Sequence, residues 1–316
     1  MTNQQKRSVL ITGCSQGGAG NALALEFAAK GYRVFATARS QKTLGNLREK
    51  GIETLVLDVT DPDSIRALAV EIASRTQGSL DMLINNAGTC NQHGHLECRS
   101  PSANHQFTVY EAPAVEADPS RVRQLFATNV FGLMEMVTAF TPLLLASVAP
   151  NYTPTIVNVA SILARLPNLF SSAYNASKAA VVSYSDTLRL EVQPLGLRVV
   201  TLYMGEVSTP LMATENINFG PDSIYRDVED SVKARTTAHL EKTMPPAEFA
   251  RQVVGALING KDSFLWKGTN AFVVWLLNAV GPRTVFDGIM KKSGGLDKAE
   301  VRESVFRLGQ ERAKSG

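Results

Sequence analysis

The chain has little cysteine, few aromatic side chains and no long apolar run. It is 316 residues long and contains three cysteines, with aromatic residues making up 7% of the total. Three cysteines cannot build the disulfide framework of small secreted domains, so we expect a reducing compartment. The first ten residues pass from a polar start straight into an apolar run without the cleavage site of a signal peptide. We therefore expect a cytoplasmic protein.

Blocks of like charge are absent as well. The 32 basic and 29 acidic residues give a formal net charge of +3 and are spread along the chain. This balance does not indicate nucleic-acid binding. With 44% apolar residues, the chain is able to bury a sizeable core. Because no linker, repeat or low-complexity segment interrupts it, residues 1–316 are predicted to form one domain.

Short apolar runs alternate with longer segments of helical periodicity. Strands are predicted at 8–12, 33–38, 54–59, 80–85, 155–161, 197–203 and 263–267. Helices are predicted at 20–30, 61–77, 120–147 and 172–192. Strands that are apolar on both faces and separated by helices indicate a parallel sheet covered on both sides. The predicted fold class is α/β, a doubly wound Rossmann fold of about seven strands.

A glycine-rich turn, ITGCSQGGAGNALA, joins the first predicted strand to the first helix. Glycine permits a tight turn and lets backbone amides approach a pyrophosphate at a helix N-terminus. The alternative is a loop that merely needs a flexible backbone, but the position after an N-terminal strand favours dinucleotide binding. The residues of the turn expected to contact the cofactor are Gly13, Ser15, Gln16, Gly18, Ala19 and Gly20.

The end of the second strand indicates which cofactor is used. An acidic residue there would bind the ribose 2′-hydroxyl group, but Thr37, Ala38 and Ser40 are not acidic and Arg39 is basic. An arginine suits a 2′-phosphate, so NADPH or NADP⁺ is the predicted cofactor. The alternative is a solvated surface arginine.

Tyr174 and Lys178 are four residues apart on a predicted helix and therefore share one face. A neighbouring ammonium group favours the phenolate and lowers the pKa of a tyrosine, which makes it a usable acid. Ser161 ends the strand that precedes this helix. Its hydroxyl group could bind a reacting carbonyl oxygen at the carboxyl edge of the sheet.

Taken together, these motifs resemble the short-chain dehydrogenase/reductase family over about residues 7–260. They are TGxxxxGxG at 12–20, NNAG at 85–88, Asn129 in ATNVFG, Ser161, and YxxxK at 174–178. The turn is one residue longer than the usual TGxxxGxG of the family, and Met204 stands where a proline is usual. Among the subgroups of the family, the chain most resembles the 1-acyldihydroxyacetone-phosphate reductases, for example in the sequence ATAR at the second strand.

The resemblance implies a role for each catalytic residue. Tyr174 would protonate the carbonyl oxygen, Ser161 would orient it, and Lys178 would lower the tyrosine pKa and bind the nicotinamide ribose. Asn129 would hold a water that relays protons to Lys178. Further cofactor contacts are implied for Asp58, Val59, Asn86, Ala87, Gly88, Val207 and Thr209, besides Tyr174 and Lys178. The implied partners are a small-molecule ketone or alcohol and further copies of the chain, as a dimer or tetramer.

Residues 90–111 are predicted to be an insertion, which is long for a connection in an α/β fold. Cys90, His93, His95 and Cys98 lie within it. Their C-x2-H-x-H-x2-C spacing is unlike common structural zinc sites, and the family's chemistry needs no metal, so no metal site is predicted. A polar substrate lid is favoured over a plain surface loop, because ligands bind beyond the carboxyl ends of parallel strands.

Residues 205–245 are predicted to cap the substrate, and Leu163, Leu211, Met212 and Tyr225 are candidate substrate contacts. For each of them, ordinary packing is the alternative. A helical extension is expected over 268–316. Its apolar segment AFVVWLLNAV is too short to span a membrane. It could pack on its own domain, lie in a membrane interface, line a substrate channel or contact a partner subunit.

The predicted activity is reduction of an apolar, lipid-like or secondary-metabolite ketone with NADPH. An alternative is alcohol oxidation at the same site, because microscopic reversibility makes the residues identical. A second alternative is a non-catalytic NADP(H)-binding sensor or scaffold, which would be expected to have lost the tyrosine or the lysine.

Overall fold

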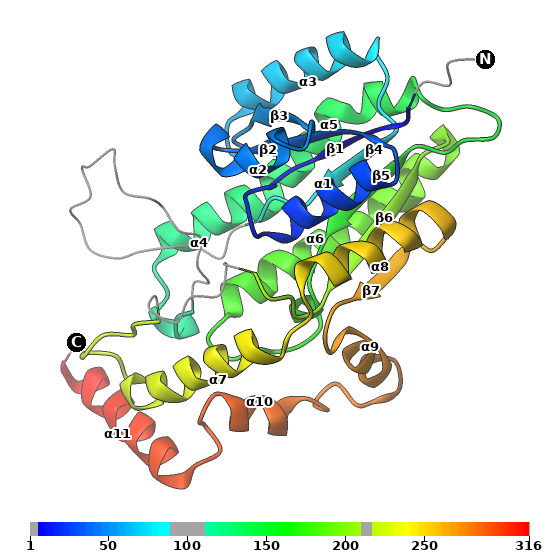
Figure 1. Ribbon diagram of the computed structural model, residues 1–316. Helices are drawn as coiled ribbons and strands as arrows, with labels where there is room; N and C mark the ends of the chain where they lie inside the picture. The colour runs from blue at the N-terminus through cyan, green and yellow to red at the C-terminus, as the bar shows by residue number, and fades with distance from the viewer. Residues whose placement is uncertain (1–5, 89–110, 210–216, 316) are drawn as a thin grey trace.

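A computed structural model describes residues 6–88, 111–209 and 217–315, without the side chains of 239–241 and 315 (Figure 1). One sheet of seven parallel strands, in the order β3-β2-β1-β4-β5-β6-β7, forms its centre. The strands are β1 (Ser8–Ile11), β2 (Arg33–Ala38), β3 (Glu53–Val56), β4 (Met82–Asn85), β5 (Thr155–Val159), β6 (Arg198–Met204) and β7 (Phe264–Lys267). The predicted fold class and the predicted strands are confirmed, although β3 ends two residues before Asp58.

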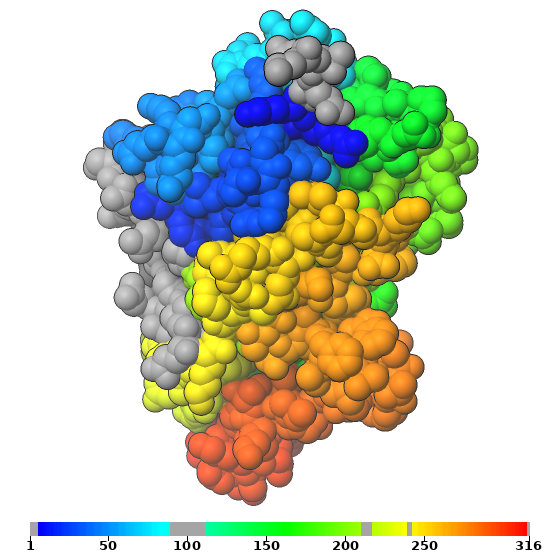
Figure 2. Space-filling view, turned by 45° about the vertical axis from the view of Figure 1, so that its right-hand side comes forward, coloured from blue at the N-terminus to red at the C-terminus, as the bar shows by residue number. Residues whose placement is uncertain are grey.

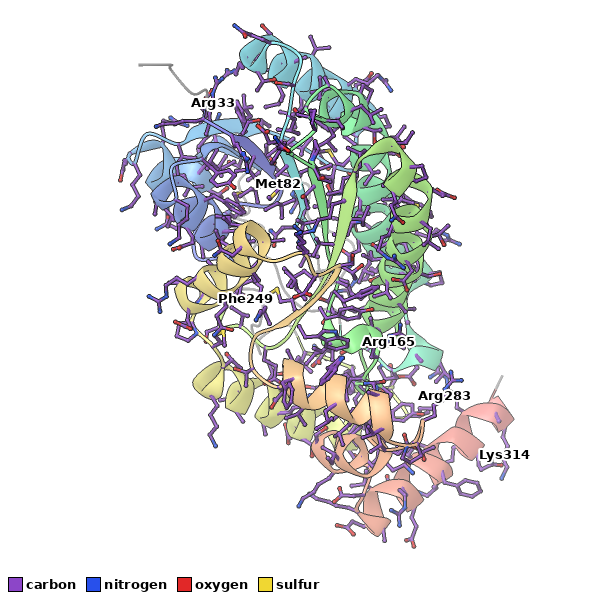
Figure 3. The ribbon with its side chains drawn as sticks, turned by 90° about the vertical axis from the view of Figure 1, so that its right-hand side faces the viewer. Arg33, Met82, Arg165, Phe249, Arg283 and Lys314 are labelled. Atoms are coloured by element: carbon purple, nitrogen blue, oxygen red, sulfur yellow. The ribbon has the colours of Figure 1, made fainter. Side chains whose placement is uncertain are left out.

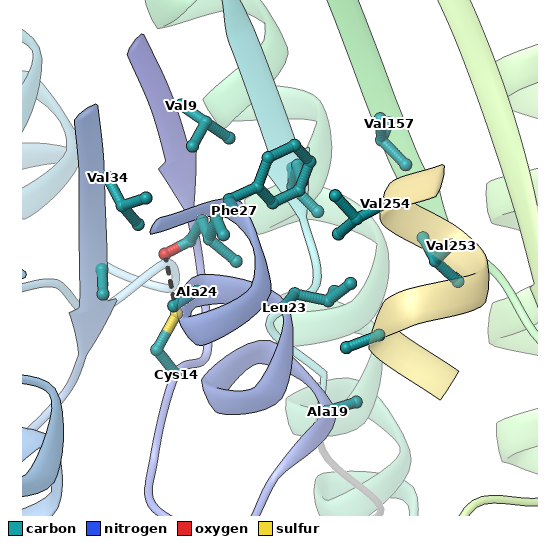
Figure 4. Close-up of a cluster of buried hydrophobic side chains, with 14 of the residues drawn as sticks. Val9, Cys14, Ala19, Leu23, Ala24, Phe27, Val34, Val157, Val253 and Val254 are labelled. Carbon is teal, nitrogen blue, oxygen red and sulfur yellow. Dashed lines mark hydrogen bonds between the residues drawn. The ribbon is translucent and has the colours of Figure 1, made fainter. Parts of the chain in front are cut away.

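Each central strand is apolar on both faces because its side chains alternate between two cores. Val9 and Ile11 of β1 pack under α1 (Ala19–Ala29) and α8 (Pro246–Asn259). Leu10 points to the opposite core, which is covered by α3 (Pro62–Thr76), α5 (Gly132–Leu145) and α6 (Ser172–Val192). Figure 4 shows Leu23 and Phe27 of α1 facing α8 in the first core.

Cys14 belongs to the first core and not to a reactive site. Its side chain is fully buried, and its Sγ atom lies 3.3 Å from the Ile11 carbonyl oxygen (Figure 4). Burial raises the pKa of the thiol to about 12, although a hydrogen bond with the backbone of Thr37 opposes the shift. The thiol is therefore neutral at physiological pH and acts as a small apolar side chain.

Helix boundaries follow local chemistry. The Asp61 side chain accepts a hydrogen bond from the Asp63 amide, and Pro62 occupies the first turn, so α3 begins where this N-cap signal predicts. The predicted helix 120–147 is instead two helices, α4 (Pro119–Phe126) and α5, joined by a π-helical turn, Ala127–Phe131. Shorter elements are η1 (Gln41–Leu44), α2 (Gly45–Arg48), η2 (Ala114–Glu116), η4 (Ile162–Ala164) and η5 (Gln193–Leu195).

The segments after β6 and β7 build a helical region at the lower end of the molecule in Figures 1 and 2. It contains η7 (Arg226–Val228), α7 (Glu229–Lys242), α9 (Ala271–Val280), α10 (Asp287–Ser293) and α11 (Ala299–Ser315). The predicted helical C-terminal extension is thereby confirmed. The organisation of residues 1–316 as one domain stays a prediction, and the insertion at 90–111 lies outside the described residues except for Glu111.

Candidate active site

The turn between β1 and α1 packs tightly against the end of β4. Gly13 has a φ of +73°, and a Cβ atom there would lie 2.8 Å from the Ala87 Cα atom. A Cβ atom on Gly20 would lie 2.5 Å from the Gly13 carbonyl oxygen. Side chains at these two positions would force the turn apart. The bare backbone is also what allows a pyrophosphate to approach the amides at the start of α1.

Hydrogen bonds hold this turn to the NNAG segment. The amides of Asn86 and Ala87 donate to the Thr12 hydroxyl oxygen over 3.0 and 2.8 Å. The Asn86 side-chain amide donates to the carbonyl oxygens of Thr12 at 2.9 Å and Gly13 at 3.1 Å. The Asn86 side chain therefore holds the turn against the residues that follow β4.

A pocket opens beside the turn at the carboxyl edge of the sheet. Its lining residues are Gly13, Ser15, Thr37, Ala38, Arg39, Leu57, Asp58, Val59, Ala87, Gly88 and Thr128. Gly13, Ser15, Arg39, Asp58, Val59, Ala87 and Gly88 were predicted from the sequence to contact a cofactor. Gln16, Gly18, Ala19 and Gly20, which form the turn itself, are not among the described lining residues, and neither are Asn86, Tyr174, Lys178, Val207 and Thr209. Thr37, Ala38, Leu57 and Thr128 also line the pocket and were not among the predicted contacts, although Ala38, Leu57 and Thr128 are each adjacent to a predicted site residue.

The charge at the β2 end of the pocket is positive. Arg39 is exposed there, between Ala38 and Ser40. The Asp58 carboxylate is bound within its own turn, because its Oδ1 atom accepts hydrogen bonds from the Thr60 amide at 2.9 Å and hydroxyl at 2.7 Å. Arg39 is therefore the basic side chain among the described residues that line this end of the pocket.

Lys178 is buried close to the ring of Tyr174. Its ammonium nitrogen donates a hydrogen bond of 2.9 Å to the Val159 carbonyl oxygen and lies 5.8 Å from the centre of the Tyr174 ring. The lysine is 5% exposed and the tyrosine is half-buried. Both come from the first two turns of α6, which carries the YxxxK residues on one face.

Asn129 approaches the same lysine from the π-helical turn. A Cβ atom on Gly88 would lie 3.4 Å from Asn129 Oδ1 and 3.5 Å from Lys178 Nζ, so both groups lie beside Gly88. The Asn129 side-chain amide donates to the Ser177 hydroxyl oxygen at 3.1 Å. Single π-turns inside helices are frequent at functional sites. The sequence predicted Asn129 but gave no signal for this turn.

Ser161 follows β5 and is 7% exposed. Its Oγ atom accepts a hydrogen bond of 3.1 Å from the Leu163 amide at the start of η4. This bond fixes the position of Oγ, and the hydroxyl group can still donate a hydrogen bond to a carbonyl oxygen.

The loop after β6 is anchored on both sides. Val207 and Thr209 are buried, and Val207 forms an isolated β-bridge with Met244. Met204 ends β6 in register with Lys267 of β7, so methionine in place of proline leaves the strand intact. Both predicted cofactor contacts on this loop therefore have fixed positions next to the carboxyl end of β6.

The candidate substrate contacts are dispersed. Leu163 packs in a small cluster with Ala271 of α9 and Phe286, beside the Ser161 loop. Tyr225 packs edge-on against Phe170, with ring centres 5.6 Å apart. Leu211 and Met212 lie outside the described residues. The roles of all these residues, and of the predicted catalytic and cofactor residues, stay predictions.

Groups of three or more His, Cys, Asp or Glu side chains able to hold a metal ion do not occur among residues 6–88, 111–209 and 217–315. Cys90, His93, His95 and Cys98 lie outside these ranges.

The fold and site define a nicotinamide-dependent oxidoreductase of the Rossmann type, and comparison with known proteins identifies its family. The family model described as short chain dehydrogenase matches residues 7–218. The chain belongs to the short-chain dehydrogenase/reductase family.

Relatives that match over most of both chains occur among fungal proteins. The chain is 41% identical over 296 residues to the NADPH-dependent 1-acyldihydroxyacetone phosphate reductase of Schizosaccharomyces pombe, covering 92% of this chain and 88% of the relative. It is 35% identical over 294 residues to the short-chain dehydrogenase ptmH of Penicillium ochrochloron, covering 92% and 99%. Among solved structures, a short-chain dehydrogenase from Streptomyces avermitilis matches with a TM-score of 0.67 at 25% identity, covering 99% of both chains.

Proposed function

We propose that the protein is an NADPH-dependent reductase of an apolar, lipid-like or secondary-metabolite ketone. The observation that carries this proposal is the meeting of Asn129 and Lys178 at Gly88, beside a glycine-lined pocket and on the helix of Tyr174. The relative in Schizosaccharomyces pombe is described as an NADPH-dependent reductase, which supports the choice of cofactor.

The residues present fit NADPH. Side chains on Gly13 and Gly20 would collide with neighbouring backbone, so the turn presents a bare cradle for the pyrophosphate. Arg39 would bind the 2′-phosphate at the far end of the pocket, and Asp58 and Val59 would border the adenine. When bound, NADPH supplies the hydride.

The protein's own residues would manage the carbonyl oxygen and its proton. Ser161 would hold the oxygen by a hydrogen bond, and Tyr174 would donate the proton as negative charge develops there. Lys178 would provide a fixed positive charge below the phenol. Asn129 would connect Lys178 to water and thereby return the proton to Tyr174.

The test is NADPH oxidation by the purified protein against acyl-dihydroxyacetone phosphate, steroid and aromatic polyketide ketones. We expect turnover with a member of this panel, and we expect Tyr174→Phe to bind NADPH with unchanged affinity while losing nearly all activity. Turnover by Tyr174→Phe at the wild-type rate would contradict the assigned acid. Tight NADPH binding without turnover of any ketone would favour a sensor or scaffold.

Alcohol oxidation with NADP⁺ uses the same groups in reverse. Comparing kcat/KM in both directions at equal cofactor concentrations tests the proposed direction. A ratio that favours oxidation at neutral pH would reverse this assignment.

We also propose that the protein is cytoplasmic and binds an anionic lipid surface through α9. Only Ala271 and Val274 of this helix are buried, whereas Phe272 is 65% exposed, Trp275 42% and Val280 74%. The centres of the Phe272 and Trp275 rings lie 5.5 Å apart, so the two rings form one aromatic surface. Aromatic side chains of this kind favour the membrane interface.

Positive charge flanks this apolar surface. Between Lys267 and Arg283 the sequence has no charged residue, and Arg283 lies beside α9 in Figure 3. Lys291 and Lys292 are exposed at the end of α10. At ten residues, α9 is about 15 Å long and cannot cross a hydrocarbon core of about 30 Å. Its charge and shape therefore suit a surface of anionic lipid.

Vesicle flotation tests this surface. Binding should require phosphatidylserine in phosphatidylcholine vesicles, weaken with salt, and fall in Phe272→Ser/Trp275→Ser. Phe306→Ser is the matched control, because Phe306 is 68% exposed but lies on α11. Equal binding by both variants, or a concentration-dependent dimer that the double variant abolishes, would refute the lipid assignment. The homo-oligomer implied by the family stays a prediction that light scattering tests.

A further inference from the structure

The turn that leads into the tyrosine helix has an unusual backbone conformation. Phe170 has a φ of +65°, in the left-handed region that bulky residues rarely adopt. Ser171 follows as the N-cap residue of α6, and Tyr174 is the third residue of that helix. Conformations of this kind persist only when surrounding contacts impose them. The position of Tyr174 therefore depends on what holds Phe170.

The contacts that hold Phe170 come from residues outside α6. The Ala112 amide donates a hydrogen bond of 2.8 Å to the Phe170 carbonyl oxygen. The Phe170 ring packs against Phe219 and Tyr225, at 5.2 and 5.6 Å between ring centres. Both aromatic partners belong to the predicted substrate-capping region. The turn is thus clamped between that region and the segment that begins at Glu111.

A buried ion pair spans the same turn. Arg235 of α7 donates to Glu111 Oε1 over 2.5 Å, and the side chains are 16% and 4% exposed. The same carboxylate oxygen accepts a hydrogen bond of 3.3 Å from the Ser171 hydroxyl group. Arg235 also donates to the Leu169 carbonyl oxygen at 3.3 Å. The pair therefore forms hydrogen bonds with Leu169 and Ser171, the residues on either side of Phe170, and joins them to α7.

A second carboxylate extends the connection to the rest of the capping region. Glu116 accepts hydrogen bonds from the Ser223 hydroxyl at 2.6 Å and the Ile224 amide at 3.0 Å. It also accepts one of 2.6 Å from Arg312 of α11. The short segment between Glu111 and Glu116 therefore binds the capping region at two points and the last helix at one.

We propose that Glu111 and Arg235 are positioning residues that couple the substrate-capping region to Tyr174. A carboxylate and a guanidinium group in a low-dielectric setting resist separation, because either one left alone would be a buried charge without its partner. The pair keeps the Phe170 turn in its left-handed conformation and thereby sets where α6 begins. Displacement of α7 would move the phenol relative to the carbonyl oxygen. This inference rests on the proposed reductase activity.

Arg235→Met is the primary test, with kcat, KM and the Kd for NADPH measured separately. We expect kcat to fall by about 10- to 100-fold, since small displacements of a reacting group have effects of that size. The Kd for NADPH should stay within about twofold, because neither residue is among the described lining residues of the pocket. Glu53→Gln is the matched control. Glu53 forms a half-exposed ion pair with Arg33 and Arg75 at the opposite end of the fold, and its loss should leave kcat unchanged.

Arg235→Lys provides the test if Arg235→Met fails to fold. Lysine keeps a positive charge opposite Glu111. Its single ammonium group cannot also donate to the Leu169 carbonyl oxygen, as the forked guanidinium group of arginine does. An intermediate loss of kcat, with unchanged Kd for NADPH, supports positioning. A wild-type kcat in a folded Arg235 variant, or an equal loss of kcat in Glu53→Gln, overturns it.

Hydrogen exchange separates this inference from the proposed reaction. In the free protein, the amides of residues 171–176 should exchange faster in Arg235→Met than in wild type or Glu53→Gln. Unchanged exchange there refutes the coupling. Faster exchange in a protein that turns over no ketone would leave the coupling in place and refute the reductase proposal alone.

Discussion

The Lys178 ammonium group donates a hydrogen bond of 2.9 Å to the Val159 carbonyl oxygen, across the boundary between α6 and β5. This bond holds the charge inside the protein, below the Tyr174 ring and beside Asn129. The strand that leads to Ser161 therefore also fixes the lysine. Ser161, which is proposed to hold the carbonyl oxygen, and Lys178, which is proposed to support the proton donor Tyr174, are therefore both positioned by the end of β5.

Lys178→Met should lower kcat by about 100- to 10,000-fold, the range expected when support for a general acid is lost. The Val159 carbonyl oxygen would lose its buried donor, so the unfolding free energy should also fall by about 1–3 kcal/mol. Steady-state kinetics and thermal unfolding measure the two effects. Lys30→Met is the control, because Lys30 is 53% exposed in a surface pair with Glu26. Full activity in Lys178→Met would disprove the assigned role.

Arg39→Asp should reduce the preference for NADPH over NADH by about 10- to 100-fold, the equivalent of one or two charge-assisted hydrogen bonds. The introduced carboxylate would repel a 2′-phosphate and accept a hydrogen bond from a ribose hydroxyl group. The ratio of kcat/KM values for the two cofactors measures this. Lys42→Asp makes the same charge change nearby, outside the described pocket lining, and should leave the ratio unaltered. An unchanged ratio in Arg39→Asp would show that another group binds the 2′-phosphate of NADPH.

Gly20→Ala should destabilise the fold by about 1–3 kcal/mol through overpacking and should weaken NADPH binding. The added Cβ atom would lie 2.5 Å from both the Gly13 carbonyl oxygen and the Asn86 side-chain nitrogen. Chemical denaturation and fluorescence titration with NADPH provide the measurements. Gly255→Ala in α8 meets nothing within 4 Å and should instead be stabilising by about 0.5–1 kcal/mol. Equal stability and equal NADPH binding in the two variants would contradict the close packing described for the turn.

Glu53→Gln should lower stability at pH 7 by about 1 kcal/mol or less, as for other partly exposed ion pairs. Partial burial raises the pKa of Glu53, but hydrogen bonds from Arg33 and Arg75 outweigh this and hold the pKa below its ordinary value of 4.5. Because the folded pKa is the lower one, the contribution is complete above pH 4.5 and disappears as pH falls through the folded value. Unfolding of both proteins from pH 7 to 3 should show the difference shrinking. A difference that grew on acidification would refute the assigned ion pair.

Local sequence patterns were sufficient to predict the sheet and the motif residues. In strands such as β1, three consecutive apolar residues, Val9, Leu10 and Ile11, indicate burial on both faces. The glycine turn and YxxxK are short-range patterns whose spacing carries their chemistry. The π-turn at Asn129 was not predicted, because helical periodicity does not record one extra residue in a turn.

The sequence by itself determined the class of fold, the cofactor turn and the identity of the candidate reacting groups, because these depend on residue type and close spacing. Only the tertiary structure decided that Asn129 and Lys178 both lie beside Gly88, and that Phe272 and Trp275 of α9 are exposed. It also decided that Glu111 meets Arg235, 124 residues away. Such contacts depend on where chain segments pack in space, and no local pattern in the sequence encodes that distance.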